Sequence, residues 1–193
     1  MVKNNKSNAE DVQITRTLAN FAADLEYEDL SPEVVDWAKY LCLDFAGVTL
    51  NGSMTDSAKA VVLAFEGVGR SGPSRVIGTG TRSLLEYVAL ANGTAFHSIE
   101  MDDVYNEAAL HPGVTAYPTA LVLADMAEVS GKDFTSAVVA GYDVIGRLGR
   151  ALKGAEDYPM GSHSTGTCGT FGATAVSARL LVLEGTILSM PWE

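Results

Sequence analysis

The sequence predicts an all-α domain of about seven helices. Apolar residues recur every three or four positions along most of the 193-residue chain, which is the period of a helix that buries one face. Alternating apolar and polar residues are almost absent, and strands do not alternate with helices, so a doubly wound sheet is not expected. The expected helices span residues 14–25, 31–52, 55–67, 83–99, 113–129, 133–152 and 167–183.

The second expected helix has the clearest signals at both of its ends. The Ser31 hydroxyl can accept a hydrogen bond from a free N–H of the first turn, and Pro32 suits the first helical position. Glu33 places a negative charge near the positive end of the helix dipole. Asn51 and Gly52 are typical of the carboxyl end of a helix.

The residues outside these helices are expected to be irregular. Residues 1–13 are polar and are expected to form a flexible tail, and residues 186–193 are expected to form a short irregular tail. The helical domain is therefore expected to span residues 14–185. Residues 70–81 are rich in Gly, Pro and Ser around a strand-like piece at 75–77, which predicts at most a minor hairpin.

The composition excludes several classes of partner. The chain has 24 acidic and 13 basic residues and a net charge of −11, so phosphate groups repel it and neither nucleic acid nor a membrane surface is an expected partner. No apolar run is long enough to span a bilayer, and the polar start lacks a secretory signal, so a cytoplasmic localisation is expected. Cys42 and Cys168 are far apart in the sequence, which favours two reduced thiols and gives no metal-like pair.

His111 and His163 are the candidate catalytic residues. Each stands beside the expected start of a helix rich in small residues, where free N–H groups and the helix dipole attract an anion. The hydroxyls of Thr165 and Thr167 add neutral donors, so a carboxylate could lie beside imidazoles that titrate near neutrality. The alternative is that each histidine only caps a loop. The third histidine, His97, lies inside an expected helix and is interpreted as a hydrogen-bonded structural residue.

Three acidic residues, Glu100, Asp102 and Asp103, precede His111. In a helix, Glu100 and Asp103 would share a face. A carboxylate near a histidine raises the basicity of the imidazole and can fix its tautomer. Such a cluster could also hold a divalent metal, but no metal-binding motif is present, and a solvated acidic turn is the commoner outcome. No metal site is therefore expected.

Two motifs resemble those of the MmgE/PrpD family of enzymes. Residues 91–103, ANGTAFHSIEMDD, followed by LHPG at 110–113, are similar to a family segment that ends in a His-Pro pair. Residues 160–173, MGSHSTGTCGTFGA, resemble the second histidine motif of the family. IGTG at 77–80 fits the same order, and the resemblance covers residues 14–183.

The resemblance implies the large all-helical domain of the family without the smaller α/β lid domain that its members carry. It also implies catalysis without a metal or an organic cofactor. Carried over by position, His111 and His163 act as base and acid, and Asp103 or Asp102 orients them. The residues then expected to bind a small carboxylate substrate are Glu100, Asp102, Thr165 and Thr167.

The reactions of the family include dehydration of 2-methylcitrate, decarboxylation of cis-aconitate and epimerisation of iminodisuccinate. The resemblance therefore implies a lyase that removes a proton next to a carboxylate of a small di- or tricarboxylic acid, with an epimerase of the same kind as the alternative. The HPG and STGTCG details favour a dehydratase or epimerase branch, and Val104 stands where some members carry a hydroxyl.

The site lysines and the lid domain of the family have no counterpart in these residues. The chain is therefore expected to be an incomplete form, a poor enzyme alone, that forms a homo-oligomer or binds a partner chain. A folded, oligomerising domain without catalysis is the other alternative.

Overall fold

The structure, a computed structural model, describes residues 7–66, 72–127, 129–152, 161 and 163–181. Within these residues the chain forms seven α-helices, two short 3-10 helices and one two-stranded sheet, which confirms the predicted all-α class. The α-helices are α1 (Ser7–Asp24), α2 (Pro32–Gly52), α3 (Asp56–Ala64), α4 (Leu85–His97), α5 (Gly113–Met126), α6 (Gly131–Ala151) and α8 (Ser164–Leu180). The 3-10 helices are η1 (Tyr27–Asp29) and η2 (Asn106–Ala108), and the strands are β1 (Ser74–Arg75) and β2 (Arg82–Ser83).

Side-chain caps determine where several helices begin. The predicted cap of α2 is confirmed, because the Ser31 hydroxyl accepts a hydrogen bond from the N–H of Val34 at 3.3 Å. Thr55 caps α3 in the same way, through the N–H of Ala58 at 3.3 Å. Ser130 caps α6, and this helix therefore begins at Gly131, two residues before its predicted start.

The structure describes part of the first expected tail and none of the second. α1 begins at Ser7, so residues 7–13 are helical where a flexible tail was expected. The reason is that this stretch contains neither Gly nor Pro, so nothing ends the helix at residue 14. Residues 1–6 and the expected tail at 186–193 lie outside the described residues.

The predicted minor hairpin is present and is held against α4. β1 and β2 pair antiparallel, with Ser74 opposite Ser83. The fully buried Asn92 of α4 accepts a hydrogen bond from the N–H of Ile77 at 2.9 Å and donates one to the carbonyl of Arg75 at 3.3 Å. One side chain thus satisfies two backbone groups that the hairpin cannot satisfy itself.

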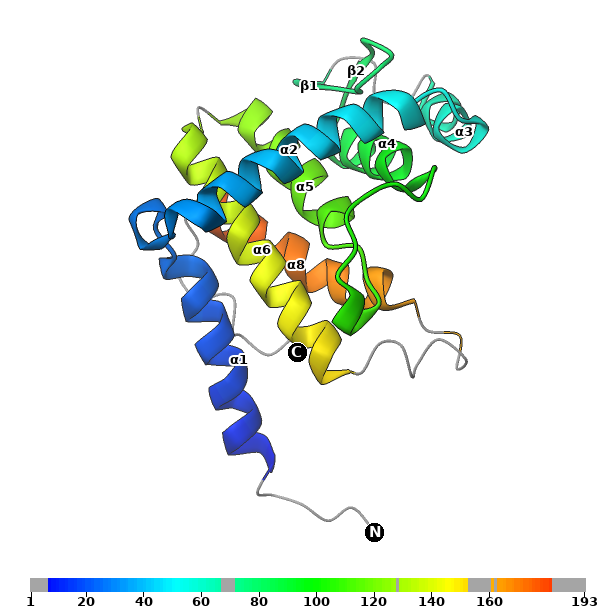
Figure 1. Cartoon of the computed structure of the whole chain (residues 1–193). Coiled ribbons are helices and arrows are strands. Elements are labelled where there is room, and N and C mark those ends of the chain that lie inside the picture. Colours follow the sequence, from blue (N-terminus) through cyan, green and yellow to red (C-terminus); the bar gives the residue numbers. More distant parts are fainter. Residues whose placement is uncertain (1–6, 67–71, 128, 153–160, 162, 182–193) are drawn as a thin grey trace.

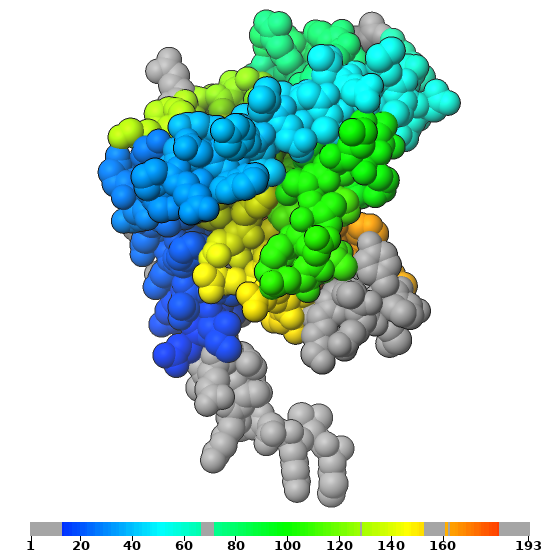
Figure 2. Space-filling view, in the orientation of Figure 1, coloured from blue at the N-terminus to red at the C-terminus, as the bar shows by residue number. Residues whose placement is uncertain are grey.

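The core lies where α2 crosses α4 and α5 (Figure 1). The ring of Phe45 from α2 meets Phe96 of α4 edge-on at 5.1 Å and stacks on Tyr117 of α5 at 5.4 Å between centroids. The hydroxyl of Tyr117 donates a hydrogen bond to the carbonyl of Ala38 at 2.7 Å, so its one polar atom has a partner. In the space-filling view α2 runs across the face as a ridge, with α6 below it (Figure 2).

α6 and α8, which are both rich in small residues, pack closely against each other. A Cβ atom on Gly141 would lie 2.6 Å from Cγ2 of Val176 and 3.1 Å from the carbonyl oxygen of Gly172. A Cβ atom on Gly172 would in turn lie 3.2 Å from the carbonyl oxygen of Gly141. The two backbones therefore approach more closely than helices with larger residues allow.

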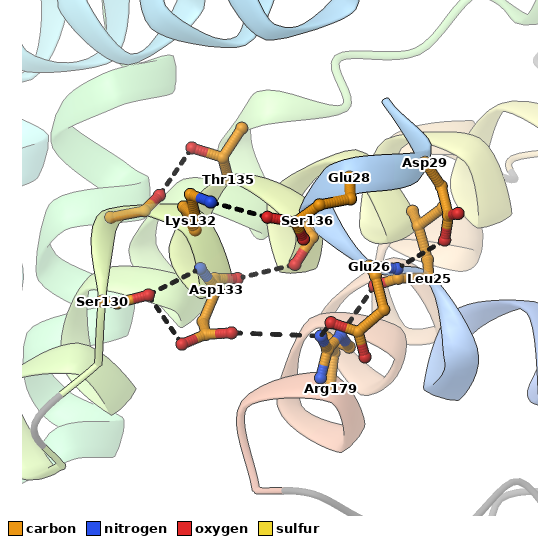
Figure 3. Close-up of polar contacts among 11 residues, drawn as sticks. Leu25, Glu26, Glu28, Asp29, Ser130, Lys132, Asp133, Thr135, Ser136 and Arg179 are labelled. Atoms are coloured by element: carbon orange, nitrogen blue, oxygen red, sulfur yellow. Dashed lines mark hydrogen bonds and ion pairs between the residues drawn. The ribbon is translucent and has the colours of Figure 1, made fainter. Parts of the chain in front are cut away.

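A polar network joins residues 25–29 to the start of α6 and the end of α8 (Figure 3). Arg179 of α8 donates hydrogen bonds to the carbonyl of Leu25 at 2.8 Å and to the Glu26 carboxylate at 2.9 Å. Lys132 at the start of α6 pairs with Glu28 at 2.6 Å. These contacts fix the turn between α1 and α2 on the other helices.

Two expectations from composition can be compared with the structure. Cys42 and Cys168 are free thiols. In the part of the chain that the structure describes, no helix combines the length and the hydropathy needed to cross a lipid bilayer.

Candidate functional site

Three imidazoles meet at the ends of three helices. His97 is the last residue of α4, His111 stands two residues before α5, and His163 caps α8. The ring centroid of His97 lies 4.7 Å from that of His111 and 6.2 Å from that of His163. The structure therefore brings the two predicted histidines together, with His97 between them.

Asp102 connects two of these rings. Its side chain is fully buried, and its Oδ2 accepts a hydrogen bond from Nδ1 of His97 at 2.8 Å. Nδ1 of His111 lies 3.1 Å from the same oxygen, although it is not aligned for a hydrogen bond. Because a carboxylate only accepts, it favours the proton on Nδ1 of each ring and leaves Nε2 to exchange protons.

The electrostatics of this pair change the basicity of His97. The hydrogen bond to Asp102 raises the pKa of His97 above its ordinary value, and this effect outweighs burial, which lowers it. The Glu100 carboxylate, 3.9 Å from Nε2 of His97, adds a smaller increase. His97 is thus protonated more readily than an ordinary imidazole.

Residues 98–112 connect α4 to α5. Glu100 and Asp103 lie outside any helix, so the helical face that they were predicted to share is absent. α4 ends at His97, and Glu100 has a left-handed backbone with φ of 53°. Ala109 also has a positive φ, 48°, next to the bridge that pairs Tyr105 with Leu110. Two such residues reverse the chain and carry it to the start of α5, which is where His111 must lie.

Asp103 faces away from the imidazoles. Its carboxyl lies against Gly113 and the hydroxyl of Tyr142, beside a separate pocket of about 410 Å³ that also contains Arg147 and Arg150. Burial raises the pKa of Asp103 to about 6. Of the two carboxylates expected to orient the histidines, Asp102 contacts them and Asp103 does not.

The predicted threonines have different roles in the structure. The buried hydroxyl of Thr165 accepts a hydrogen bond from the backbone N–H of His111 at 3.0 Å, which ties the two histidine segments together. His163 caps α8, with its Nδ1 accepting from the N–H of Gly166 at 3.4 Å. Thr167 is exposed and is not among the residues that line the groove beside these rings.

That groove runs between α4, α5 and α8 and has a volume of about 980 Å³. His97 and His163 line it together with several hydroxyl-bearing residues: Thr94, Ser98, Thr115, Thr119, Thr165 and Thr170. Among its described lining residues there is no lysine or arginine. The groove can therefore exchange protons and donate neutral hydrogen bonds, but it offers an anion no full positive charge apart from protonated imidazole.

The sequence interpretation missed the role of His97. Its position inside a helix favoured a structural role, and the hydrogen bond to Asp102 is indeed present. The signal that could have identified it is its spacing, since it ends the helix five residues before Asp102 within the same motif. A histidine at the end of a helix can reach the acidic turn that follows, whereas a histidine in the middle of a helix is too far away.

Comparisons with known proteins agree with this architecture. The family model described as the MmgE/PrpD N-terminal domain matches residues 16–188. The chain is 30% identical over 178 residues to the cis-aconitate decarboxylase-like protein oryM of Aspergillus oryzae, covering 89% of this chain and 37% of that protein. It is 27% identical over 175 residues to cis-aconitate decarboxylase of Aspergillus terreus, covering 88% of this chain and 36% of that protein.

The human cis-aconitate decarboxylase is similar to the same degree. It is 29% identical over 178 residues, which covers 90% of this chain and 37% of the human protein. The chain thus spans little more than a third of the length of the curated relatives that it matches.

Proposed function

Since the chain belongs to the MmgE/PrpD family, of which it carries the N-terminal domain, we propose that it provides the imidazoles of a lyase site. The substrate class is a small di- or tricarboxylic acid. The observation that carries the proposal is the contact of one buried carboxylate, Asp102, with both His97 and His111. A buried carboxylate beside an imidazole is the arrangement that makes the imidazole an effective base near neutral pH.

In the proposed reaction His111 and His163 exchange protons with the substrate, and Asp102 positions His111. For dehydration, an imidazole takes the proton next to a carboxylate, and the neighbouring hydroxide leaves with a proton from a second acid. For decarboxylation, the C–C bond breaks, CO₂ leaves, and an imidazolium protonates the carbon that keeps the electron pair. The two reactions therefore use the same proton-transferring groups.

The similarity to cis-aconitate decarboxylases and to a decarboxylase-like protein favours decarboxylation of cis-aconitate as the reaction to test first. Dehydration, which the HPG and STGTCG motifs favour, and epimerisation are the alternatives within the family. A different alternative is a folded domain that does no chemistry. It is favoured by the absence of lysine and arginine from the described lining of the groove.

We expect small polycarboxylates to bind beside the imidazoles. The test is a titration of the chain with cis-aconitate, 2-methylcitrate and iminodisuccinate, with the imidazole C–H signals followed by nuclear magnetic resonance. Chloride at equal ionic strength is the control for screening. We expect the signals of His97, His111 and His163 to shift with the polycarboxylates and not with chloride.

Two neighbouring variants make the test specific to the proposed chemistry. In deuterated water, the bound substrate should gain deuterium next to its carboxylate, and Asp102→Asn should slow this exchange by about tenfold or more. Asp103→Asn, equal in size and adjacent in sequence, should leave the exchange unchanged because Asp103 faces the other pocket. Equal effects of both variants, or no imidazole shift with any polycarboxylate, would contradict the proposal.

A further inference from the structure

We propose that His97, Asp102 and His111 form a binding site for a divalent transition-metal ion, for which Zn²⁺ is the fitting occupant. One ligand atom from each of the three side chains lies within 4.8 Å of the other two. The proposal does not depend on the proposed lyase activity, because it concerns occupancy of this cluster and not turnover.

The ligand types select the class of metal. Two imidazoles and one carboxylate are a common set for zinc and for other late divalent first-row metals. Mg²⁺ and Ca²⁺ prefer oxygen ligands and are disfavoured by two nitrogen donors. Three protein ligands also leave a fourth tetrahedral position for water or an anion from the groove.

Two of the three distances between ligand atoms are close to those of a tetrahedral site. Ligands at about 2.0–2.1 Å from a tetrahedral ion are roughly 3.3 Å apart. Asp102 Oδ2 lies 2.8 Å from Nδ1 of His97 and 3.1 Å from Nδ1 of His111. Both distances from Oδ2 therefore need to open by a few tenths of an ångström. Rotation of the two partly exposed rings must also bring their nitrogen atoms, which lie within 4.8 Å of each other, to that separation.

Two buried polar atoms of the cluster lack a hydrogen-bond partner, and one of them is a proposed metal ligand. In the described part of the chain, Asp102 Oδ1 and His111 Nδ1 are buried and have no hydrogen-bond partner. Buried polar atoms are normally satisfied, and an unsatisfied one is costly. An ion bound by Oδ2 of Asp102 and by Nδ1 of His111 would satisfy that nitrogen.

The charges around the cluster also favour a cation. The carboxylates of Asp44 and Asp103 are close enough to Asp102 for electrostatic repulsion. Among the described residues, no lysine or arginine pairs with these three acids, since Arg147 pairs with Asp143 and Arg150 with Glu107. A divalent ion would therefore relieve a local excess of negative charge.

Binding is balanced by the release of protons. In the metal-free cluster, Nδ1 of His97 holds the proton that it donates to Asp102. When the ion binds, a proton on either Nδ1 leaves to solvent and the nitrogen lone pair coordinates the metal. The ligands in the occupied site are two neutral imidazoles and one carboxylate.

The test is a titration of the chelator-treated 193-residue chain with Co²⁺, whose visible absorption reports the ligand geometry. We expect one equivalent to bind with a four-coordinate spectrum, Zn²⁺ to displace it, and Mg²⁺ to have no effect. His97→Ala and Asp102→Asn should each weaken the Co²⁺ affinity by about tenfold or more. His163→Ala is the matched control and should keep the affinity, because its Nδ1 caps α8.

A measurement on the unmodified chain covers the case in which a variant fails to fold. Paramagnetic Co²⁺ should broaden the imidazole signals of His97 and His111 more than those of His163. Absence of Co²⁺ binding, affinity unchanged in the two ligand variants of a folded chain, or equal broadening of all three rings would each overturn the proposal.

Discussion

Asp102 and Asp103 are adjacent in the sequence, but they have different neighbours and different chemistry. Asp102 contacts two imidazoles, which compensate its charge when they are protonated. Asp103 lies against Gly113 and Tyr142, and burial is the main cause of its raised pKa. Ionisation of Asp103 is thus less favourable in the folded chain than in the unfolded chain.

This difference predicts a stabilising substitution. The pKa of Asp103 rises from its ordinary 3.8 to about 6 on folding, so the folded chain prefers the protonated form. Its contribution to stability is therefore present below pH 3.8 and is lost as the pH rises through 6. Asp103→Asn cannot ionise, and we expect it to raise the free energy of unfolding at pH 7.5 by about 1–3 kcal/mol.

Urea unfolding of both proteins at two pH values checks this expectation. Near pH 4 the folded Asp103 is protonated, so the two chains should differ little in stability. His97 also titrates, but it does so in both proteins, and its contribution cancels in the difference. A variant that is less stable than the parent at pH 7.5 would show that the charged form of Asp103 is stabilised and not penalised.

At the scale of helices, close packing of α6 on α8 depends on glycine. Gly141 faces Val176 and Gly172 with no room for a side chain. In contrast, Gly47 on the outer side of α2 has no atom within 4 Å of the position that a Cβ would take. The same substitution at these two positions should therefore have opposite effects.

We expect Gly141→Ala to lower the free energy of unfolding by about 1–3 kcal/mol, because the new methyl group overpacks the interface. Gly47→Ala should raise it by about 0.5–1 kcal/mol, because alanine favours the helical backbone more than glycine does. Chemical denaturation of the two variants beside the parent measures both changes. Equal stability of the Gly141→Ala and Gly47→Ala variants would contradict the close packing of α6 against α8.

At the scale of the whole molecule, the described lining of the groove contains no lysine or arginine to stabilise a polycarboxylate. Electrostatic stabilisation of a developing anion is usually the largest catalytic term. The helix starts beside His111 and His163 supply only partial charges. Since the chain spans little more than a third of its relatives, we propose that the remaining positive groups come from residues beyond this domain.

We therefore expect the 193-residue chain to be a poor enzyme alone. Its kcat/KM for cis-aconitate should lie at least about a hundredfold below that of the human relative assayed beside it. Release of CO₂ measures decarboxylation of cis-aconitate. Parallel samples with 2-methylcitrate measure dehydration. Comparable activity of the two proteins would mean that groups within this domain supply the positive charge.

The outer face of α2 bears on assembly. Several large apolar side chains there are exposed: Trp37, Tyr40, Leu43 and Leu50. Large apolar side chains exposed together on one helix are typical of an interface. We propose that the chain self-associates through α2.

Sedimentation velocity tests this proposal with one substitution on α2 and one elsewhere. Leu43→Glu should shift the chain towards monomer, because a charge in the contact opposes burial. Ile14→Glu, at an exposed position on α1, should leave the distribution unchanged. A monomeric parent at high concentration, or equal sensitivity to both substitutions, would contradict the proposal.

The sequence by itself determined the helical class, the hairpin between α3 and α4, and the histidines placed at helix starts. These features depend on interactions within a few residues, such as the Ser31 cap and the apolar period of a helix. They can therefore be recognised without knowing what lies opposite. The extra turns of α1 were missed because polar residues without a breaker are compatible with either helix or tail.

Only the tertiary structure decided which side chains meet. The left-handed residues Glu100 and Ala109 reverse the chain, so Asp102 and not Asp103 reaches the imidazoles. Thr165 contacts the N–H of His111 from 54 residues away, and His97 joins the cluster because α4 ends beside both histidine segments. Periodicity predicts which face of a helix is buried, but contacts between distant segments depend on how the whole chain packs.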